Sequence, residues 1–167
     1  DRLDYDAVEP MRFSGVKKLF ERKRVIDPSL VYYYGSKYSE SNIVSLEYEL
    51  DCLKKIVSFY NIQKKRLIYF AHRDESSEKL AMIQNKFDIE VSIPDKTAEV
   101  YLLESAVLPV EIASAISSVL VNVCIIFPEL GVRSFRFSSS EIAQNARPNI
   151  EMKYDYLVKS GIPSEAV

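Results

Sequence analysis

The single histidine of the sequence, His72, directly follows a short apolar run at residues 67–71, and Arg73, Asp74 and Glu75 come next. The run is rich in Ile, Tyr and Phe, which is typical of a strand buried on both faces. Open α/β sheets bind ligands at the C-terminal ends of their strands. A hydrogen-bonded boundary residue is the alternative interpretation of His72, but the charged neighbours favour a binding site.

Two adjacent serines, Ser117 and Ser118, lie where a predicted strand at residues 110–116 gives way to a predicted helix at residues 119–127. Hydroxyl groups and unpaired backbone N–H groups at the start of a helix can bind a phosphate. Simple N-capping of the helix is the alternative. The sequence has neither the glycine fingerprint of dinucleotide-binding folds nor a P-loop motif, so those two kinds of phosphate site are not indicated.

Three acidic residues are further candidates. Glu99 lies in a turn that leads into a helix, where a carboxylate can bind the hydroxyls of a ribose. Glu47 and Asp51 are four residues apart on one predicted helix, off its apolar stripe, and either one could act as a general base. The alternative is a solvated helix face on which Asp51 pairs with Lys55.

The elements that would position these residues alternate between strands and helices. The clearest helix covers residues 46–60, with apolar residues at helical spacing and Ser45 as its N-cap. A strand at residues 30–34 precedes it and the strand at 67–71 follows it, which gives a βαβ unit. Further helices are predicted at residues 76–85, 97–103 and 150–159, and further strands at 89–93 and 132–137. A strand at 99–103 is the alternative to the second of these helices.

This pattern predicts an α/β fold, a Rossmann-like three-layer sandwich with a mostly parallel sheet, over residues 30–167. Residues 1–29 are predicted to be an arm or linker that contains a short basic helix at residues 15–23. The irregular segment at residues 1–12 is a candidate dimer contact.

The composition excludes some classes of protein. The 167 residues are 47% hydrophobic and 28% charged, which is typical of a globular domain, and the formal net charge is −2. No overall basic field indicates a nucleic-acid partner. The longest apolar run is about half of the roughly 20 residues that a membrane span requires. The abrupt acidic start suggests a fragment of a longer protein.

The order and spacing of five short segments resemble those of bacterial sialyltransferases. The segments are residues 34–36 (Tyr-Gly-Ser), residues 68–75, Glu99, residues 116–120 and residues 126–128. The chain is most similar to the lipooligosaccharide sialyltransferases of glycosyltransferase family 52, which are distantly similar to the bacterial polysialyltransferases. The resemblance covers residues 30–140. It implies a GT-B fold of two Rossmann-like domains, of which this chain looks like the C-terminal half, the domain that binds the sugar nucleotide.

The resemblance also implies roles for residues. His72 would contact the phosphate of CMP-sialic acid and act as its general acid, with Arg73 in place of the proline of the family's His-Pro motif. Ser117 and Ser118 match the serine pair that holds the same phosphate, and Glu99 fits the acidic residue that binds the ribose.

Gly35 and Arg73 complete the predicted donor site, and Asp51, rather than Glu47, is the expected general base. The implied reaction is an inverting transfer of sialic acid from CMP-sialic acid to a glycan hydroxyl of a cell-surface saccharide, with no metal or other cofactor.

The implied partners are a sugar nucleotide, a glycan acceptor, a second copy of the chain and an N-terminal acceptor domain outside it. The implied location is the bacterial cytoplasm, peripheral at the inner face of the cytoplasmic membrane. Two other functions stay open: the same fold acting on another sugar nucleotide, and a non-catalytic Rossmann-like interaction domain.

Overall fold

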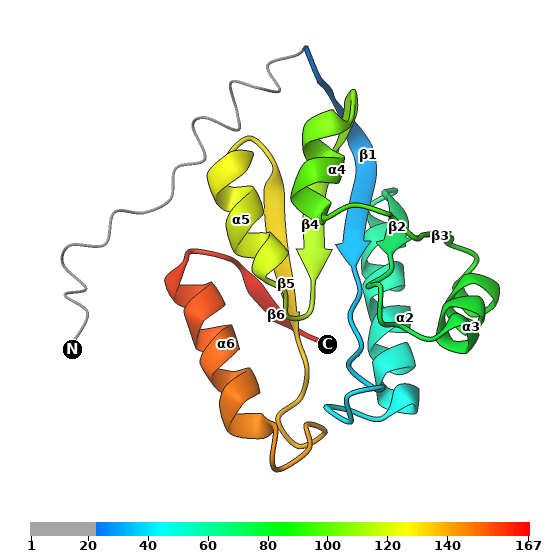
Figure 1. Ribbon diagram of the computed structural model, residues 1–167, viewed down its shortest axis with the longest axis vertical. Coiled ribbons are helices and arrows are strands. Elements are labelled where there is room, and N and C mark those ends of the chain that lie inside the picture. The colour runs from blue at the N-terminus through cyan, green and yellow to red at the C-terminus, as the bar shows by residue number, and fades with distance from the viewer. Residues whose placement is uncertain (1–22) are drawn as a thin grey trace.

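The computed structural model describes residues 23–167, which form one sheet with helices on both of its faces (Figure 1). The six strands of this part of the chain are all parallel and run in the order β3-β2-β1-β4-β5-β6. The strands are β1 (Val25–Tyr34), β2 (Arg66–Phe70), β3 (Glu90–Ser92), β4 (Val107–Ser114), β5 (Gly131–Arg136) and β6 (Ser164–Ala166). The helices are α2 (Leu46–Ile62), α3 (Ser77–Phe87), α4 (Ala98–Glu104), α5 (Ser118–Ile126) and α6 (Arg147–Lys159). The predicted Rossmann-like three-layer fold is confirmed.

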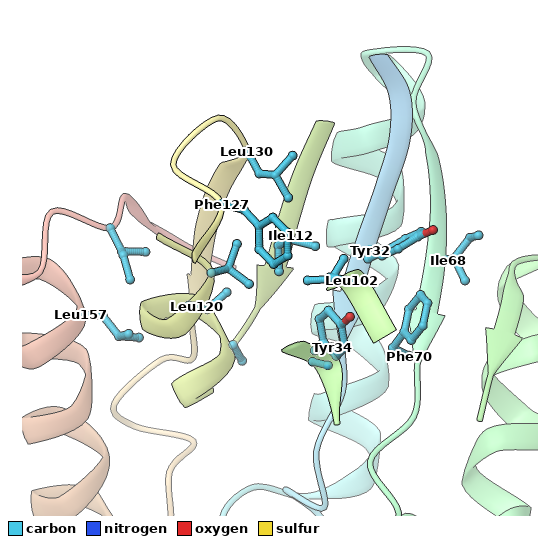
Figure 2. Close-up of a cluster of buried hydrophobic side chains, with 14 of the residues drawn as sticks. Tyr32, Tyr34, Ile68, Phe70, Leu102, Ile112, Leu120, Phe127, Leu130 and Leu157 are labelled. Carbon is cyan, nitrogen blue, oxygen red and sulfur yellow. The ribbon is translucent and has the colours of Figure 1, made fainter. Parts of the chain in front are cut away.

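The side chains of β1 alternate between two separate cores, as expected for a strand in the middle of a sheet. Val31 and Tyr33 pack with apolar residues of α2 and α3 on one face. Tyr32 and Tyr34 pack on the other face, with apolar residues of α4, α5 and α6. Figure 2 shows part of this second core, where Tyr32 and Tyr34 of β1 lie beside Phe70 of β2. The sheet is therefore buried on both faces at β1.

Strand β1 begins at Val25, five residues earlier than predicted, so the predicted domain boundary at residue 30 divides this strand. Its first part pairs with β4 up to Asp27, and the register shifts before pairing resumes at Val31. Pro28, which cannot donate a backbone hydrogen bond, lies at this irregularity. The early part is largely exposed, so it has none of the apolar pattern on which the prediction of a strand depends.

Helix α2 follows the sequence pattern closely. Its buried residues repeat at helical spacing, and the hydroxyl of Ser45 accepts a hydrogen bond from the amide of Tyr48, as an N-cap does. Helix α4 confirms the helical interpretation of residues 97–103 over the alternative strand. Strand β6 was not predicted, because it is short and its sequence, Ser-Glu-Ala, has no apolar signal.

The predicted arm, most of the basic helix at residues 15–23 and the candidate dimer contact lie outside the described residues. Within residues 23–167, no helix combines the length and the apolar character that crossing a membrane requires.

Candidate functional site

The loops after β1, β2 and β4, which carry Gly35, His72 and Ser117, leave the same edge of the sheet. The last residue of β1, Tyr34, is level with Phe70 of β2 and with Ser114 of β4. Consecutive connections move outward from β1 in one direction through β2 and β3, and in the other through β4, β5 and β6. The C-terminal ends of β1 and β4 therefore form the topological switch point at which Rossmann-like sheets bind ligands.

The serine pair lies on one side of this switch point, at the start of α5. Ser117 is the N-cap, and its hydroxyl accepts a hydrogen bond from the amide of Val119 at 3.2 Å. Ser118 is exposed. Both serines line a cavity of about 280 Å³ between α5 and α6, together with Ile116, Val121, Lys153, Tyr156 and Leu157. A helix N-terminus, two hydroxyl groups and one lysine in a single cavity suit an anion such as a phosphate.

Lys153 was not predicted to belong to the site. It is an exposed lysine in a helix far along the sequence from the serine pair, and no local motif marks it. Only the packing of α6 beside α5 brings it to the serines.

Glu99, in α4, does not line this cavity, but its side chain contacts α5. One of its carboxylate oxygens accepts a hydrogen bond of 2.7 Å from the side-chain amide of Asn122 in α5. Asn122 is four residues after Ser118, so the two side chains lie on the same face of α5, one turn apart. Glu99 thus contacts α5 one turn beyond the serine pair, through Asn122. Asn122 was not predicted.

His72 lies after β2 and does not pack into the core. Its side chain is 38% exposed, and its Nδ1 atom accepts a hydrogen bond of 3.2 Å from the amide of Asp74. Because Nδ1 is an acceptor, the proton of the neutral ring lies on Nε2, where it can be donated to a ligand.

Arg73 and Asp74 complete the exposed part of this loop. The Arg73 side chain is 87% exposed, with its Nε atom 3.8 Å from the Asp74 carboxylate. Lys37, from the loop after β1, donates a hydrogen bond of 2.8 Å to Asp74, and this bond lowers the pKa of the Asp74 carboxyl group. The loop after β2 is thus fastened to the loop after β1, while the Arg73 guanidinium group extends into solvent.

His72 and Ser117 follow strands that are separated by β1, and two strand spacings amount to about 10 Å. The two groups therefore form opposite walls of the switch point. A ligand that contacts both must extend across the end of β1, over Gly35 and Ser36.

Gly35 has a structural reason to be glycine. A Cβ atom at this position would lie 2.0 Å from the hydroxyl oxygen of Tyr69 and 2.3 Å from its Cζ atom. The Tyr69 hydroxyl group donates to Glu75 at 2.6 Å. The close approach of this buried ring to the backbone requires a residue without a side chain, whether or not a ligand also passes over it.

The acidic residues of α2 divide into exposed and buried ones. Asp51 is exposed and pairs with Lys55 at 3.4 Å, and Glu47 is exposed as well. Glu49, which was not predicted, is buried and lies 2.5 Å from the ammonium group of Lys79. Burial raises the pKa of Glu49, and its bonds to Lys79 and Ser39 offset only part of that effect. Glu75, from the predicted polar cluster, is also buried against Lys79.

A family model described as "A-2_8-polyST: Alpha-2,8-polysialyltransferase (POLYST)" matches residues 12–136. A search of curated proteins finds no match. Among solved structures, the chain is similar to the UDP-GlcNAc 2-epimerase of Methanocaldococcus jannaschii in complex with UDP-GlcNAc and UDP, with a TM-score of 0.50 and 16% sequence identity.

The alignment with the epimerase covers 92% of this chain and 38% of the epimerase chain, so this chain spans about two fifths of that enzyme. At this identity the likeness shows the fold. The family match confirms the sialyltransferase part of the sequence resemblance, whereas the assignment to glycosyltransferase family 52 stays a prediction.

Proposed function

We propose, because the chain belongs to the alpha-2,8-polysialyltransferase family, that residues 23–167 form the donor-binding domain of a sialyltransferase that uses CMP-sialic acid. The observation that carries the proposal is the cavity at the start of α5. It places Ser117, Ser118 and Lys153 together beside the switch point of a Rossmann-like sheet. Glu99 contacts the same helix through Asn122.

In this proposal the start of α5 binds the phosphate of CMP. The helix dipole, the two serine hydroxyls and the Lys153 ammonium group all favour a negative charge there. Glu99 accepts hydrogen bonds from the ribose hydroxyls, with Asn122 holding its carboxylate in place. The phosphate then lies over the end of β1, where the side chain of His72 contacts it from the opposite wall of the switch point.

The proposed reaction breaks the bond between the anomeric carbon of sialic acid and the phosphate oxygen of CMP. The electron pair of that bond stays on the phosphate oxygen, which receives the Nε2 proton of His72. An acceptor hydroxyl attacks the opposite face of the anomeric carbon and loses its proton to Asp51, so the configuration inverts. Glu47, also exposed on α2, is the alternative base. Glu49 is excluded from this role because its oxygens are held by Lys79 and by the amide of Ser39.

The acceptor glycan and the domain that would bind it belong to the same proposal. We therefore choose a test that needs only this chain: titration with CMP by calorimetry. We expect CMP to bind, and the variants Ser117→Ala and His72→Ala to bind it more weakly.

Ser45→Ala is the matched control for Ser117→Ala, because Ser45 is the N-cap of α2 and lies outside the cavity. Both variants lose a cap, which costs about 1 kcal/mol of stability. Only Ser117→Ala should weaken CMP binding. Binding of UDP in place of CMP would indicate another sugar nucleotide. If neither nucleotide binds at millimolar concentration and the two serine variants behave alike, the chain is an interaction domain and the proposal is wrong.

A further inference from the structure

A lysine ammonium group is buried beneath the loop that carries His72. Lys79 lies in the first turn of α3, and its side chain is only 1% exposed. The positive end of the helix dipole disfavours a cation at this position, and burial of a charge is costly in itself. The surroundings of this lysine must therefore compensate for both effects.

Three carboxylates from three different segments surround the Lys79 ammonium group. Its Nζ atom lies 2.5 Å from Glu49 of α2, 2.9 Å from Glu75 of the loop after β2, and 3.2 Å from Glu40 of the loop after β1. It also donates a hydrogen bond of 2.9 Å to the carbonyl oxygen of Ser36. A single cation thus joins both loops that border the proposed donor site on this side of the switch point.

The contact that reaches the site runs through Glu75. One oxygen of its buried carboxylate accepts a hydrogen bond of 2.6 Å from the backbone amide of His72. The other oxygen accepts the hydroxyl proton of Tyr69 at 2.6 Å and contacts Lys79. Both oxygens of Glu75 therefore have hydrogen-bond partners. Lys79 contacts the same carboxylate group that holds the backbone amide of His72.

The other two carboxylates fix neighbouring backbone in the same way. Glu49 accepts a hydrogen bond of 3.0 Å from the amide of Ser39, and Glu40 accepts one of 3.0 Å from the amide of Ser76. Burial alone would lower the pKa of Lys79, but the carboxylates of Glu75 and Glu49 outweigh burial and keep the pKa above its ordinary value. The ammonium group is thus charged at neutral pH.

Stability alone is a poor explanation for this cluster. Three carboxylates around one ammonium group carry an excess of negative charge, and a buried ion pair is often no more stabilising than well-packed apolar residues. What the cluster provides is geometry, because every carboxylate holds a backbone amide of one of the two loops.

We propose that Lys79 and Glu75 are positioning residues, which hold the backbone of His72 so that its imidazole ring faces the donor. This inference rests on the proposed function of His72. The carboxylate of Glu75 acts on the amide of His72, and Lys79 holds that carboxylate in place.

The test compares Glu75→Gln with Glu49→Gln. Each variant removes one buried carboxylate from the same ammonium group, so both should lose stability. Only Glu75→Gln weakens the bond to the His72 amide, because a neutral amide cannot accept hydrogen bonds through both of its terminal atoms. Because His72 is the single histidine of the chain, the imidazole signals in a proton–carbon NMR spectrum report on it alone in protein without a histidine tag.

We expect Glu75→Gln to shift or broaden the His72 signals and to weaken CMP binding about tenfold, roughly the loss of one good hydrogen bond. Glu49→Gln should leave the His72 signals close to those of the original protein. If Glu75→Gln does not fold, Glu75→Asp serves instead, since it keeps the charge and shortens the reach to the His72 amide.

Equal effects of the two variants on the His72 signals would overturn the positioning role, and so would unchanged signals in Glu75→Gln. The proposed function fails in a different way: the original protein would then not respond to CMP at all. In that case the His72 signals without ligand still decide whether Glu75 positions this residue.

Discussion

The hydroxyl group of Tyr38 forms two hydrogen bonds with the backbone of Ile116. It donates to the carbonyl oxygen at 3.0 Å and accepts from the amide at 2.9 Å. Tyr38 is in the loop after β1 and Ile116 in the loop after β4, so this buried side chain connects the two sides of the switch point. Ile116 immediately precedes Ser117, and the start of α5 is thereby fixed relative to β1.

Replacing Tyr38 with Phe should therefore affect both stability and ligand binding. The variant leaves the amide and carbonyl of Ile116 without these partners, and the expected loss is about 1–3 kcal/mol in the free energy of unfolding. Urea denaturation measures this loss, and CMP affinity should fall with it. Tyr48→Phe is the control, because its hydroxyl accepts a hydrogen bond from an exposed amide, that of Ser138, and does not bind the backbone of Ile116. A loss no larger than that of Tyr48→Phe would contradict this account.

The effect of Lys153 on CMP binding can be separated from the effect of the net charge of the protein. Lys153→Met removes a cation from the cavity at the start of α5, whereas Lys159→Met removes one from the end of the same helix, outside that cavity. We expect only Lys153→Met to weaken CMP binding, several-fold at low salt and less at high salt, because ions screen an exposed charge. Calorimetry at two salt concentrations measures both quantities. Equal weakening by the two variants would mean that only the net charge matters.

Gly35 is expected to act through Tyr69. Gly35→Ala places a Cβ atom in the space of the Tyr69 hydroxyl group and should destabilise the fold by about 1–3 kcal/mol, the usual cost of overpacking. Combining it with Tyr69→Leu should cost less than the sum of the two single variants, because the obstructing ring is gone. Thermal denaturation of all four proteins gives this coupling. Full stability of Gly35→Ala with weaker CMP binding would instead indicate that Gly35 makes room for the ligand.

Patterns that depend on neighbours in sequence predicted most of the fold. The apolar stripe and the Ser45 cap identified α2, and the apolar run before His72 identified β2, because burial on one or both faces leaves a period in the sequence. The beginning of β1 was missed because residues 25–29 are largely exposed and include a proline. Where burial is absent, this signal is absent as well.

The sequence indicated candidate site residues where they follow a strand or begin a helix, as His72 and the serine pair do. Lys153 was missed because only the packing of α6 beside α5 brings it to the serine pair. Asn122 was missed because its contact with Glu99 depends on the packing of α4 against α5. The Lys79 cluster was missed for another reason. Glu75 and Lys79 have the spacing of an ordinary surface ion pair, four residues apart, and the sequence does not distinguish such a pair from a buried one.

Another buried carboxylate, that of Glu111, should make the stability of the protein depend on pH in the acid range. One of its oxygens accepts hydrogen bonds of 2.6 Å from the Tyr60 hydroxyl and from the Nε atom of Arg133. Burial alone would raise the pKa of Glu111, but the bonds from Arg133 and Tyr60 outweigh burial and lower the pKa below its ordinary value. A carboxyl group whose pKa is lower in the folded than in the unfolded state stabilises the fold at any pH above its pKa in the unfolded state. This stabilisation is lost as the pH falls through the pKa of the group in the folded state.

Glu111→Gln should therefore lower the free energy of unfolding by about 1–3 kcal/mol at neutral pH. The difference from the original protein should shrink as the pH falls below the ordinary glutamate pKa of 4.5. Urea denaturation over a pH series measures this, with Glu129→Gln as an exposed control. Glu111 is level with Gly131, the first residue of β5, and so lies away from the edge with the proposed donor site. CMP affinity of the folded variant should be unchanged, and a difference in stability that stays constant down to acid pH would show that the charge of Glu111 is not what stabilises the fold.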